Sequence, residues 1–261
     1  MLIVVSPAKA LDFESPLPTS KHSEPLMLER SRELVGIMAS KSPADLSEMM
    51  SISDDLAELN HERFQDWTTP FTTDNARPAV LAFDGDTYTG LDAKGSFDER
   101  DFTHAQKVLR ILSGLHGVLR PLDLIQPYRL EMGSKLPHDH GDDLYSFWGD
   151  SVTERLNDDL EASPGAKVLV NLASNEYSSV IVTDRFEGRI VAPRFLDAKG
   201  DAEPKVISFF AKQARGAMAG WMVRERITTF KALTGFAGLG YRLDDDRSTP
   251  EQPVFVRRSD G

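Results

Sequence analysis

The chain has 261 residues, with 30 Lys and Arg against 41 Asp and Glu, which gives a formal net charge of −11. It contains no cysteine, which excludes thiolate zinc sites, cysteine nucleophiles and iron–sulfur ligation. The N-terminal apolar stretch at residues 2–5 is far shorter than a signal-sequence core or a membrane span, so we expect a cytoplasmic protein with no membrane partner.

Short apolar runs rich in β-branched residues alternate with amphipathic patterns along the chain. The runs predict strands at residues 2–5, 80–83, 168–172, 189–192 and 205–209, and the patterns predict helices at residues 26–39, 102–112, 148–160 and 211–226. Since the run 168–172 is apolar on both faces, helices should cover both sides of the sheet. No linker or repeat divides the chain, so the sequence predicts one α/β domain over residues 1–261, with a central mixed sheet flanked by helices.

Polar residues follow several of these predicted strands. Ser6-Pro7-Ala8-Lys9 comes after the first, Asp84-Gly85-Asp86 after the second and Asn171-Leu172-Ala173-Ser174 at the end of the third. Ligands of open α/β sheets bind beyond the carboxyl ends of the strands, so we expect these groups to converge on one crevice. Asp84 and Asp86 could bind a hydrated magnesium ion there, although a solvated turn is the simpler interpretation.

Positive charge is gathered in two stretches. Residues 107–135 hold five basic residues against two acidic ones, and residues 205–231 hold six against one, so the rest of the chain is strongly acidic. Ordinary scatter of charge along helices is the alternative explanation. If the two stretches meet in space, they form a local site for an anionic ligand despite the net negative charge.

The run Leu112-Ser113-Gly114-Leu115-His116-Gly117-Val118 has the pattern of a helix–hairpin–helix element. Its two glycines can form a tight turn that offers backbone N–H groups to a DNA phosphate. A helix C-cap followed by a loop is the alternative.

The longer block that contains this run resembles the YaaA type of bacterial peroxide stress protein. The block covers residues 110–123 and continues as Pro127-Tyr128-Arg129-Leu130-Glu131-Met132-Gly133, and further matching blocks occur in order from residue 2 to about residue 241. The resemblance implies a single-domain α/β fold, a positively charged cleft, a helix–hairpin–helix element and binding of duplex or branched DNA. It also implies a role under peroxide stress in limiting unincorporated intracellular iron and oxidative damage.

Basic side chains and the two hairpin glycines are the candidate DNA or anion ligands. Arginine offers a planar fork that matches phosphate oxygens, and Glu131 should orient one of the arginines. Lys212 and Arg215 share a helix face, and the small residues that follow, such as Gly216 and Gly220, would allow another backbone to approach. The candidates are Lys9, Arg110, Gly114, Gly117, Arg120, Arg129, Glu131, Lys212 and Arg215.

Lys9, Asn171 and Glu176 are the candidate catalytic residues, because together with Ser174 they supply the amine, amide, carboxylate and hydroxyl groups of an acid–base site. Three hypotheses follow. The first is a DNA-binding stress protein without cofactor, metal or obligate protein partner. The second is an enzyme acting on a nucleotide or nucleic acid, and the third is a protein that handles iron directly.

Overall fold

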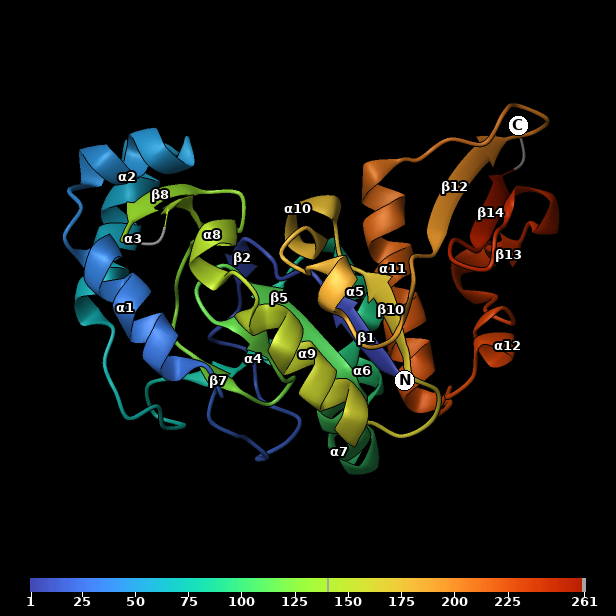
Figure 1. Cartoon of the computed structure of the whole chain (residues 1–261), viewed down its shortest axis with the longest axis horizontal. Helices are drawn as coiled ribbons and strands as arrows, with labels where there is room; N and C mark the ends of the chain where they lie inside the picture. The colour runs from blue at the N-terminus through green and yellow to red at the C-terminus, as the bar shows by residue number, and fades with distance from the viewer. Residues whose placement is uncertain (140, 260–261) are drawn as a thin grey trace.

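A computed structural model describes residues 1–139 and 141–259 of the chain (Figure 1). Its strands are β1 (Leu2–Val5), β2 (Ala10–Leu11), β3 (Arg77–Pro78), β4 (Phe83–Asp84), β5 (Leu109–Ser113), β6 (Gly117–Leu119), β7 (Leu124–Ile125), β8 (Lys135–His138), β9 (Gly141–Asp143), β10 (Val168–Leu172), β11 (Arg189–Val191), β12 (Arg194–Lys199), β13 (Arg242–Leu243) and β14 (Val254–Ser259). Its helices are α1 (Leu28–Ala39), α2 (Pro43–Met50), α3 (Asp54–Asp66), α4 (Ala79–Ala82), α5 (Asp86–Leu91), α6 (Ala93–Ser96), α7 (Glu99–Val108), α8 (Leu144–Trp148), α9 (Ser151–Ala162), α10 (Asn175–Ser178), α11 (Ser208–Arg224) and α12 (Phe230–Leu233). Three 3₁₀ turns are η1 (Thr183–Arg185), η2 (Gly238–Gly240) and η3 (Asp245–Arg247).

A five-stranded sheet in the order β11-β10-β1-β5-β6 forms the centre of the molecule. β10 and β5 pair in parallel with β1 on its two sides, and Ile3 lies opposite both Val170 and Leu109. β6 is antiparallel to β5, so the sheet is mixed. Figure 1 shows α9 in front of the sheet and α11 behind it, which explains why β1 is buried along its whole length. The predicted fold class is confirmed, as are the strands predicted around β1, β10 and β11.

Two groups of elements lie at the ends of the molecule in Figure 1. One end holds α1, α2, α3 and the β8–β9 hairpin, and the other holds the three-stranded sheet β12-β14-β13. One hydrophobic cluster nevertheless runs from Met1 through the central sheet to Phe255 of β14. No helix in the described residues is long and apolar enough to cross a membrane.

Some predicted elements are wrong. Residues 80–83 fall in the short helix α4 and the start of β4, and residues 205–209 form only a bridge from Lys205 to Asp197 before α11 begins. The helix predicted at residues 102–112 ends at Val108, where the chain continues directly as β5. Periodicity cannot separate a short buried strand from a buried helix segment, and burial on both faces makes β5 such a strand.

The helix–hairpin–helix prediction for residues 112–118 is also wrong. This segment is a β-hairpin in which Ser113 of β5 pairs with Gly117 of β6. Gly117 has a φ of +63°, and a Cβ on Gly114 would lie 2.3 Å from the carbonyl oxygen of Leu130. Gly117 therefore allows the turn of the hairpin, and Gly114 allows the backbone at Leu130 to approach closely inside the protein. The hairpin is buried, so its backbone N–H groups do not face a DNA phosphate.

The packing of α11 against α5 sets the position of the basic residues on α11. A Cβ on Gly216 would lie 1.8 Å from the carbonyl oxygen of Thr87, and a Cβ on Gly220 would lie 2.4 Å from that of Leu91. The two helix backbones are therefore in direct contact, as the small residues of α11 predict. This contact fixes α11 beside the turn that holds Asp86.

Candidate functional site

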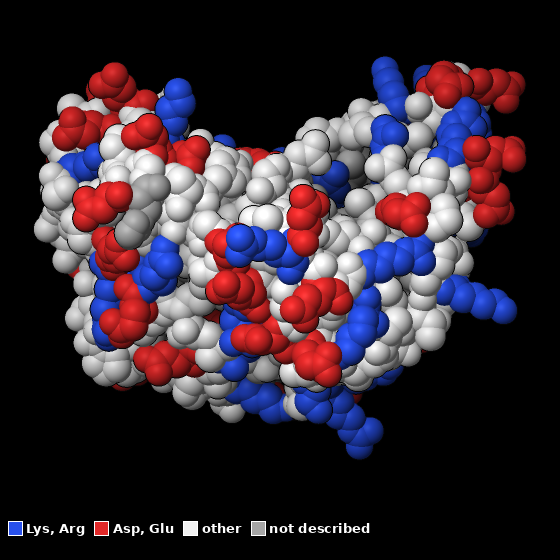
Figure 2. All heavy atoms as spheres, viewed as in Figure 1, with Lys and Arg blue, Asp and Glu red and all other residues white. Residues whose placement is uncertain are grey.

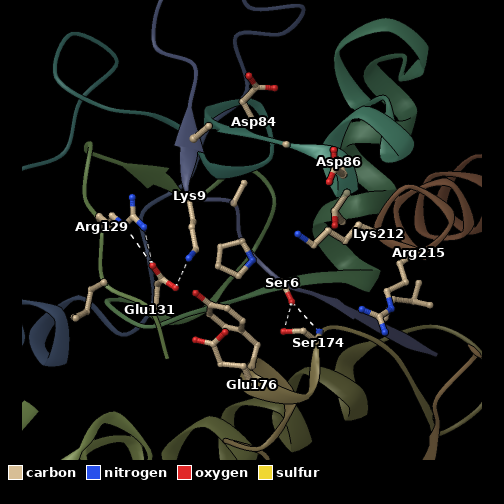
Figure 3. Close-up of a pocket in the computed structure, with 18 of the residues that line it drawn as sticks. Ser6, Lys9, Asp84, Asp86, Arg129, Glu131, Ser174, Glu176, Lys212 and Arg215 are labelled. Carbon is tan, nitrogen blue, oxygen red and sulfur yellow. Dashed lines mark hydrogen bonds and ion pairs between the residues drawn. The ribbon is translucent and has the colours of Figure 1, made fainter. Parts of the chain in front are cut away.

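A pocket of about 370 Å³ opens beyond the carboxyl ends of β1 and β10. Its walls come from the loop after β1, the turn before α5, residues 128–131, the segment from β10 into α10, and α11. Figure 3 shows polar side chains from all of these segments pointing into it. The predicted convergence of distant segments on one crevice is confirmed.

The ends of β1 and β10 are joined by a pair of serines on the wall of the pocket. The backbone N–H of Ser174 donates to Oγ of Ser6 at 2.9 Å, and Ser6 Oγ lies 3.3 Å from Ser174 Oγ. Ser6 follows β1 directly and Ser174 follows β10 by two residues. Parallel pairing of the two strands brings these hydroxyls together, so their position follows from the fold.

Lys9, Arg129 and Glu131 form an ionic network on one side of the pocket. The Lys9 Nζ lies 2.8 Å from Glu131 Oε2, and the Arg129 Nη2 lies 3.1 Å from Glu131 Oε1. Lys9 remains 64% exposed, whereas Arg129 is only 16% exposed. One carboxylate therefore faces two cations, and the expectation that Glu131 orients an arginine is confirmed for Arg129.

Glu176 adds a second carboxylate near this network. Its Oε1 accepts a hydrogen bond from the backbone N–H of Gly133 at 3.0 Å, and its carbonyl oxygen accepts one from the Tyr145 hydroxyl at 2.8 Å. The ring of Tyr177 lines the pocket beside it, and burial raises the pKa of the Tyr177 hydroxyl. This wall offers hydrogen-bond acceptors next to an aromatic surface.

Lys212 and Arg215 enter the pocket from consecutive turns of α11 (Figure 3). Neither forms an ion pair or a side-chain hydrogen bond with any residue in the described part of the chain. Lys212 is exposed, while Arg215 is half-buried, and burial lowers the pKa of its guanidinium. The α11 side of the pocket therefore carries positive charge that no carboxylate offsets by direct contact.

Asp84 and Asp86 lie on the wall formed by the turn before α5. Antiparallel pairing of β2 with β4 places Asp84 opposite Ala10, next to Lys9 in the chain. Within residues 1–139 and 141–259, no three His, Asp or Glu side chains come together as a set of metal ligands. The two aspartates give this wall a negative character, in contrast to the α11 side.

Several residues predicted for the site lie outside the pocket. Arg110 is buried, and its Nε is 2.6 Å from Asp159 Oδ2. Arg120 bonds to Asp123 at 2.7 Å and to the carbonyl oxygen of Glu24. Burial raises the pKa of Asp123, whereas its hydrogen bonds to Arg120 lower it. Both arginines thus stabilise contacts within the protein, and neither faces the pocket.

Asn171, Gly114 and Gly117 also lie outside the pocket. The Asn171 Oδ1 accepts a hydrogen bond from the backbone N–H of Ala173 and shapes the turn after β10. Both glycines belong to the buried β5–β6 hairpin. Lys9, Arg129, Glu131, Glu176, Lys212 and Arg215 are the predicted site residues that the fold does bring together.

Sequence reasoning missed two residues near this pocket. Ser6 was named only as the first residue of the polar segment after the first strand and was given no role in the site, although its place directly after a predicted strand is a signal for a residue at the sheet edge. Phe209 was assigned to a buried strand, yet its side chain is 50% exposed one turn before Lys212 on α11. The basic residues that follow Phe209 in the sequence are the signal that could have predicted a surface helix at this position.

Comparison with protein families gives one finding. A family model described as peroxide stress protein YaaA matches residues 1–247 of the chain.

Proposed function

The chain belongs to the YaaA family of peroxide stress proteins, and from that premise we propose that it is a DNA-binding protein of the peroxide stress response. The proposed ligand is duplex or branched DNA, whose backbone phosphates contact the basic wall of the pocket. The resemblance to the family extends this role to limiting unincorporated iron and the oxidative damage that it causes, and that step is part of the proposal.

The unpaired Lys212 and Arg215 are the observation that carries the proposal. In a chain with a net charge of −11, most basic groups of the first basic stretch are neutralised by carboxylates, as Arg110, Arg120 and Arg129 show. The two cations on α11 instead face an open pocket without a partner among the described residues. Charged donors that gain a phosphate partner form short, strong hydrogen bonds.

The shape of this face supports a large ligand. Figure 2 shows the molecule hollowed along its upper edge, between the end that holds α2 and β8 and the end that holds β12 and β14. Phe209 and Val206, both about half exposed, lie near the start of α11, beside the exposed Lys205. An aromatic ring next to cations suits unpaired bases, which stack on aromatic side chains while phosphates bind the charges.

Binding of labelled duplex and four-way-branched DNA at low salt tests the proposal. We expect Lys212→Gln combined with Arg215→Gln to weaken binding by at least about 10-fold, because both phosphate contacts are lost. Lys107→Gln is the matched control, since it removes an exposed charge on α7, outside the pocket, and should leave affinity within about two-fold. Equal binding by the double variant, or no binding by the unmodified protein, would overturn the proposal.

An enzyme acting on a nucleotide or nucleic acid is the second candidate function. It is favoured by one observation, that Lys9, Glu131 and Glu176 line the same pocket as a pair of serine hydroxyls. Such a set can exchange protons with a bound substrate. Incubation with a panel of nucleotides and oligonucleotides, followed by product analysis and by borohydride trapping on Lys9, tests it. Absence of both turnover and adduct would remove it.

A further inference from the structure

The α11 side of the pocket carries cations, whereas the other walls carry carboxylates, Asp84 and Asp86 on the turn before α5 and Glu131 and Glu176 opposite. Lys212 and Arg215 extend from α11 on one side, and the hydroxyls of Ser6 and Ser174 lie at the ends of the neighbouring strands. A guanidinium, an ammonium and hydroxyl donors around one space are the groups that bind a phosphate. Because Arg215 is half-buried and without a partner in the described residues, an anion beside it would offset an unfavourable desolvation.

The opposite side is unsuited to a second phosphate. There Lys9 and Arg129 are already bonded to Glu131, and Glu176 presents a further carboxylate. Carboxylates accept hydrogen bonds from the N–H groups of a base or the hydroxyls of a sugar, but they repel phosphate oxygens. The ring of Tyr177 adds an apolar surface for a base or sugar.

The size of the pocket limits its contents to a small molecule. A volume of about 370 Å³ lies near the lower end of the range of ligand pockets, which begins at about 300 Å³. A base pair within a stacked duplex cannot enter such a space. A nucleotide can do so only when it is terminal, unpaired at a branch, or turned out of the helix.

We propose that this pocket binds one nucleotide as a nucleoside monophosphate, with its phosphate at Lys212 and Arg215 and its nucleoside against Glu131, Glu176 and Tyr177. The inference rests on the proposed DNA binding and deepens it, because the same α11 cations hold the strand whose unpaired nucleotide enters the pocket. It predicts that the protein prefers DNA with an unpaired nucleotide over a fully paired duplex.

Isothermal titration with AMP, ADP, adenosine and inorganic phosphate tests the inference on the full chain. We expect AMP to bind with a dissociation constant below about 1 mM. Adenosine and phosphate, which each lack half of the contacts, should bind at least about 10-fold more weakly. ADP should also bind at least about 10-fold more weakly than AMP, because it brings additional negative charge into a pocket whose walls already carry the carboxylates of Asp84, Asp86, Glu131 and Glu176.

Three variants sharpen the test. Lys212→Gln, at an exposed position, should weaken AMP binding by about 10-fold without affecting folding, and Lys107→Gln should leave it unchanged. Glu131→Gln frees Lys9 and Arg129 from their carboxylate, so the preference for AMP over ADP should shrink by about 10-fold. An unchanged preference would contradict the assigned orientation.

The two proposals fail in different ways. If the protein binds DNA at low salt but AMP neither binds nor competes with DNA that carries one unpaired nucleotide, the nucleotide pocket is wrong and DNA binding stands. If AMP binds but no DNA does, the proposed function is wrong. Equal affinity for fully paired and unpaired DNA would also count against the pocket.

Discussion

His116 lies in the buried β5–β6 hairpin, beside the rings of Phe71 and Tyr128. Its Nδ1 is 2.9 Å from the Ser31 hydroxyl, and its Nε2 has no hydrogen-bond partner within the described structure. Burial lowers the pKa of this imidazole from 6.5 to about 3. The ring is therefore neutral in the folded protein at any pH near neutrality.

The low pKa of His116 predicts a loss of stability in mild acid. Below pH 6.5 the unfolded chain takes up a proton on this side chain, but the folded protein does not do so until about pH 3. Its contribution to the free energy of unfolding is therefore present above pH 6.5 and falls as the pH drops towards 3. Between pH 7 and pH 5 the loss should be about 2 kcal/mol.

Urea unfolding of the unmodified protein and of His116→Gln at pH 7, 6 and 5 measures this loss. The difference in unfolding free energy between the two proteins should shrink by about 2 kcal/mol over this range, because the variant has no imidazole to titrate. If the difference in unfolding free energy stays constant from pH 7 to pH 5, His116 does not titrate with the lowered pKa that its burial requires.

The roles of individual basic residues could be predicted only in part. Lys212 and Arg215 were placed correctly on one helix face, and Glu131 was correctly assigned to orient an arginine. Arg110 looks the same in sequence, but its partner Asp159 is 49 residues away. Whether an arginine is free or neutralised depends on such distant partners, which no local pattern encodes.

At the scale of elements, the predictions were correct for the amphipathic helix α1 and for the apolar runs that lie in the central sheet, but not for the similar apolar run at residues 80–83, which is mostly helical. The spacing of apolar and polar residues predicted α1, the apolar run at residues 2–5 predicted β1, and the mainly apolar run at residues 168–172 predicted β10. They failed at the junction of α7 and β5, where a helix face runs directly into a strand buried on both sides. The β5–β6 hairpin was missed because its two glycines suit a turn in either context.

The contact between α11 and α5 should not tolerate a methyl group at Gly216. Alanine normally stabilises a helix interior relative to glycine by about 1 kcal/mol. At this position its Cβ would lie 1.8 Å from the Thr87 carbonyl oxygen, a backbone atom that can move only if the two helices separate. Gly216→Ala should therefore lower the free energy of unfolding by about 1–3 kcal/mol, as overpacking does.

Gly36 provides the matched control for this substitution. It lies within α1, and a Cβ built on it meets no atom within 4 Å. Gly36→Ala should therefore stabilise the protein by about 0.5–1 kcal/mol. Thermal or urea unfolding of both variants measures the two effects. Changes of the same sign would show that the α11–α5 contact is looser than the structure indicates.

For the whole molecule, the charge balance limits how the proposed DNA ligand can bind. The net charge of −11 is carried mainly outside the pocket, and Figure 2 shows acidic side chains interspersed with basic ones over the face that it draws. At long range the protein therefore repels a polyanion, so binding must rely on a few cations at short range. Lys212 and Arg215 are the pocket cations without a carboxylate partner in the described chain.

The dependence of DNA affinity on salt should consequently be shallow. A fully paired duplex, whose nucleotides stay outside the pocket, should place one phosphate at Lys212 and another at Arg215. Each neutralised phosphate contributes about −0.9 to the slope of log affinity against log salt, so the expected slope for duplex DNA is about −2. Lys212→Gln should bring the slope close to about −1, whereas Lys107→Gln should not change it. A slope steeper than about −5 would require a second basic surface, and a slope near zero would mean that phosphates are not what the pocket binds.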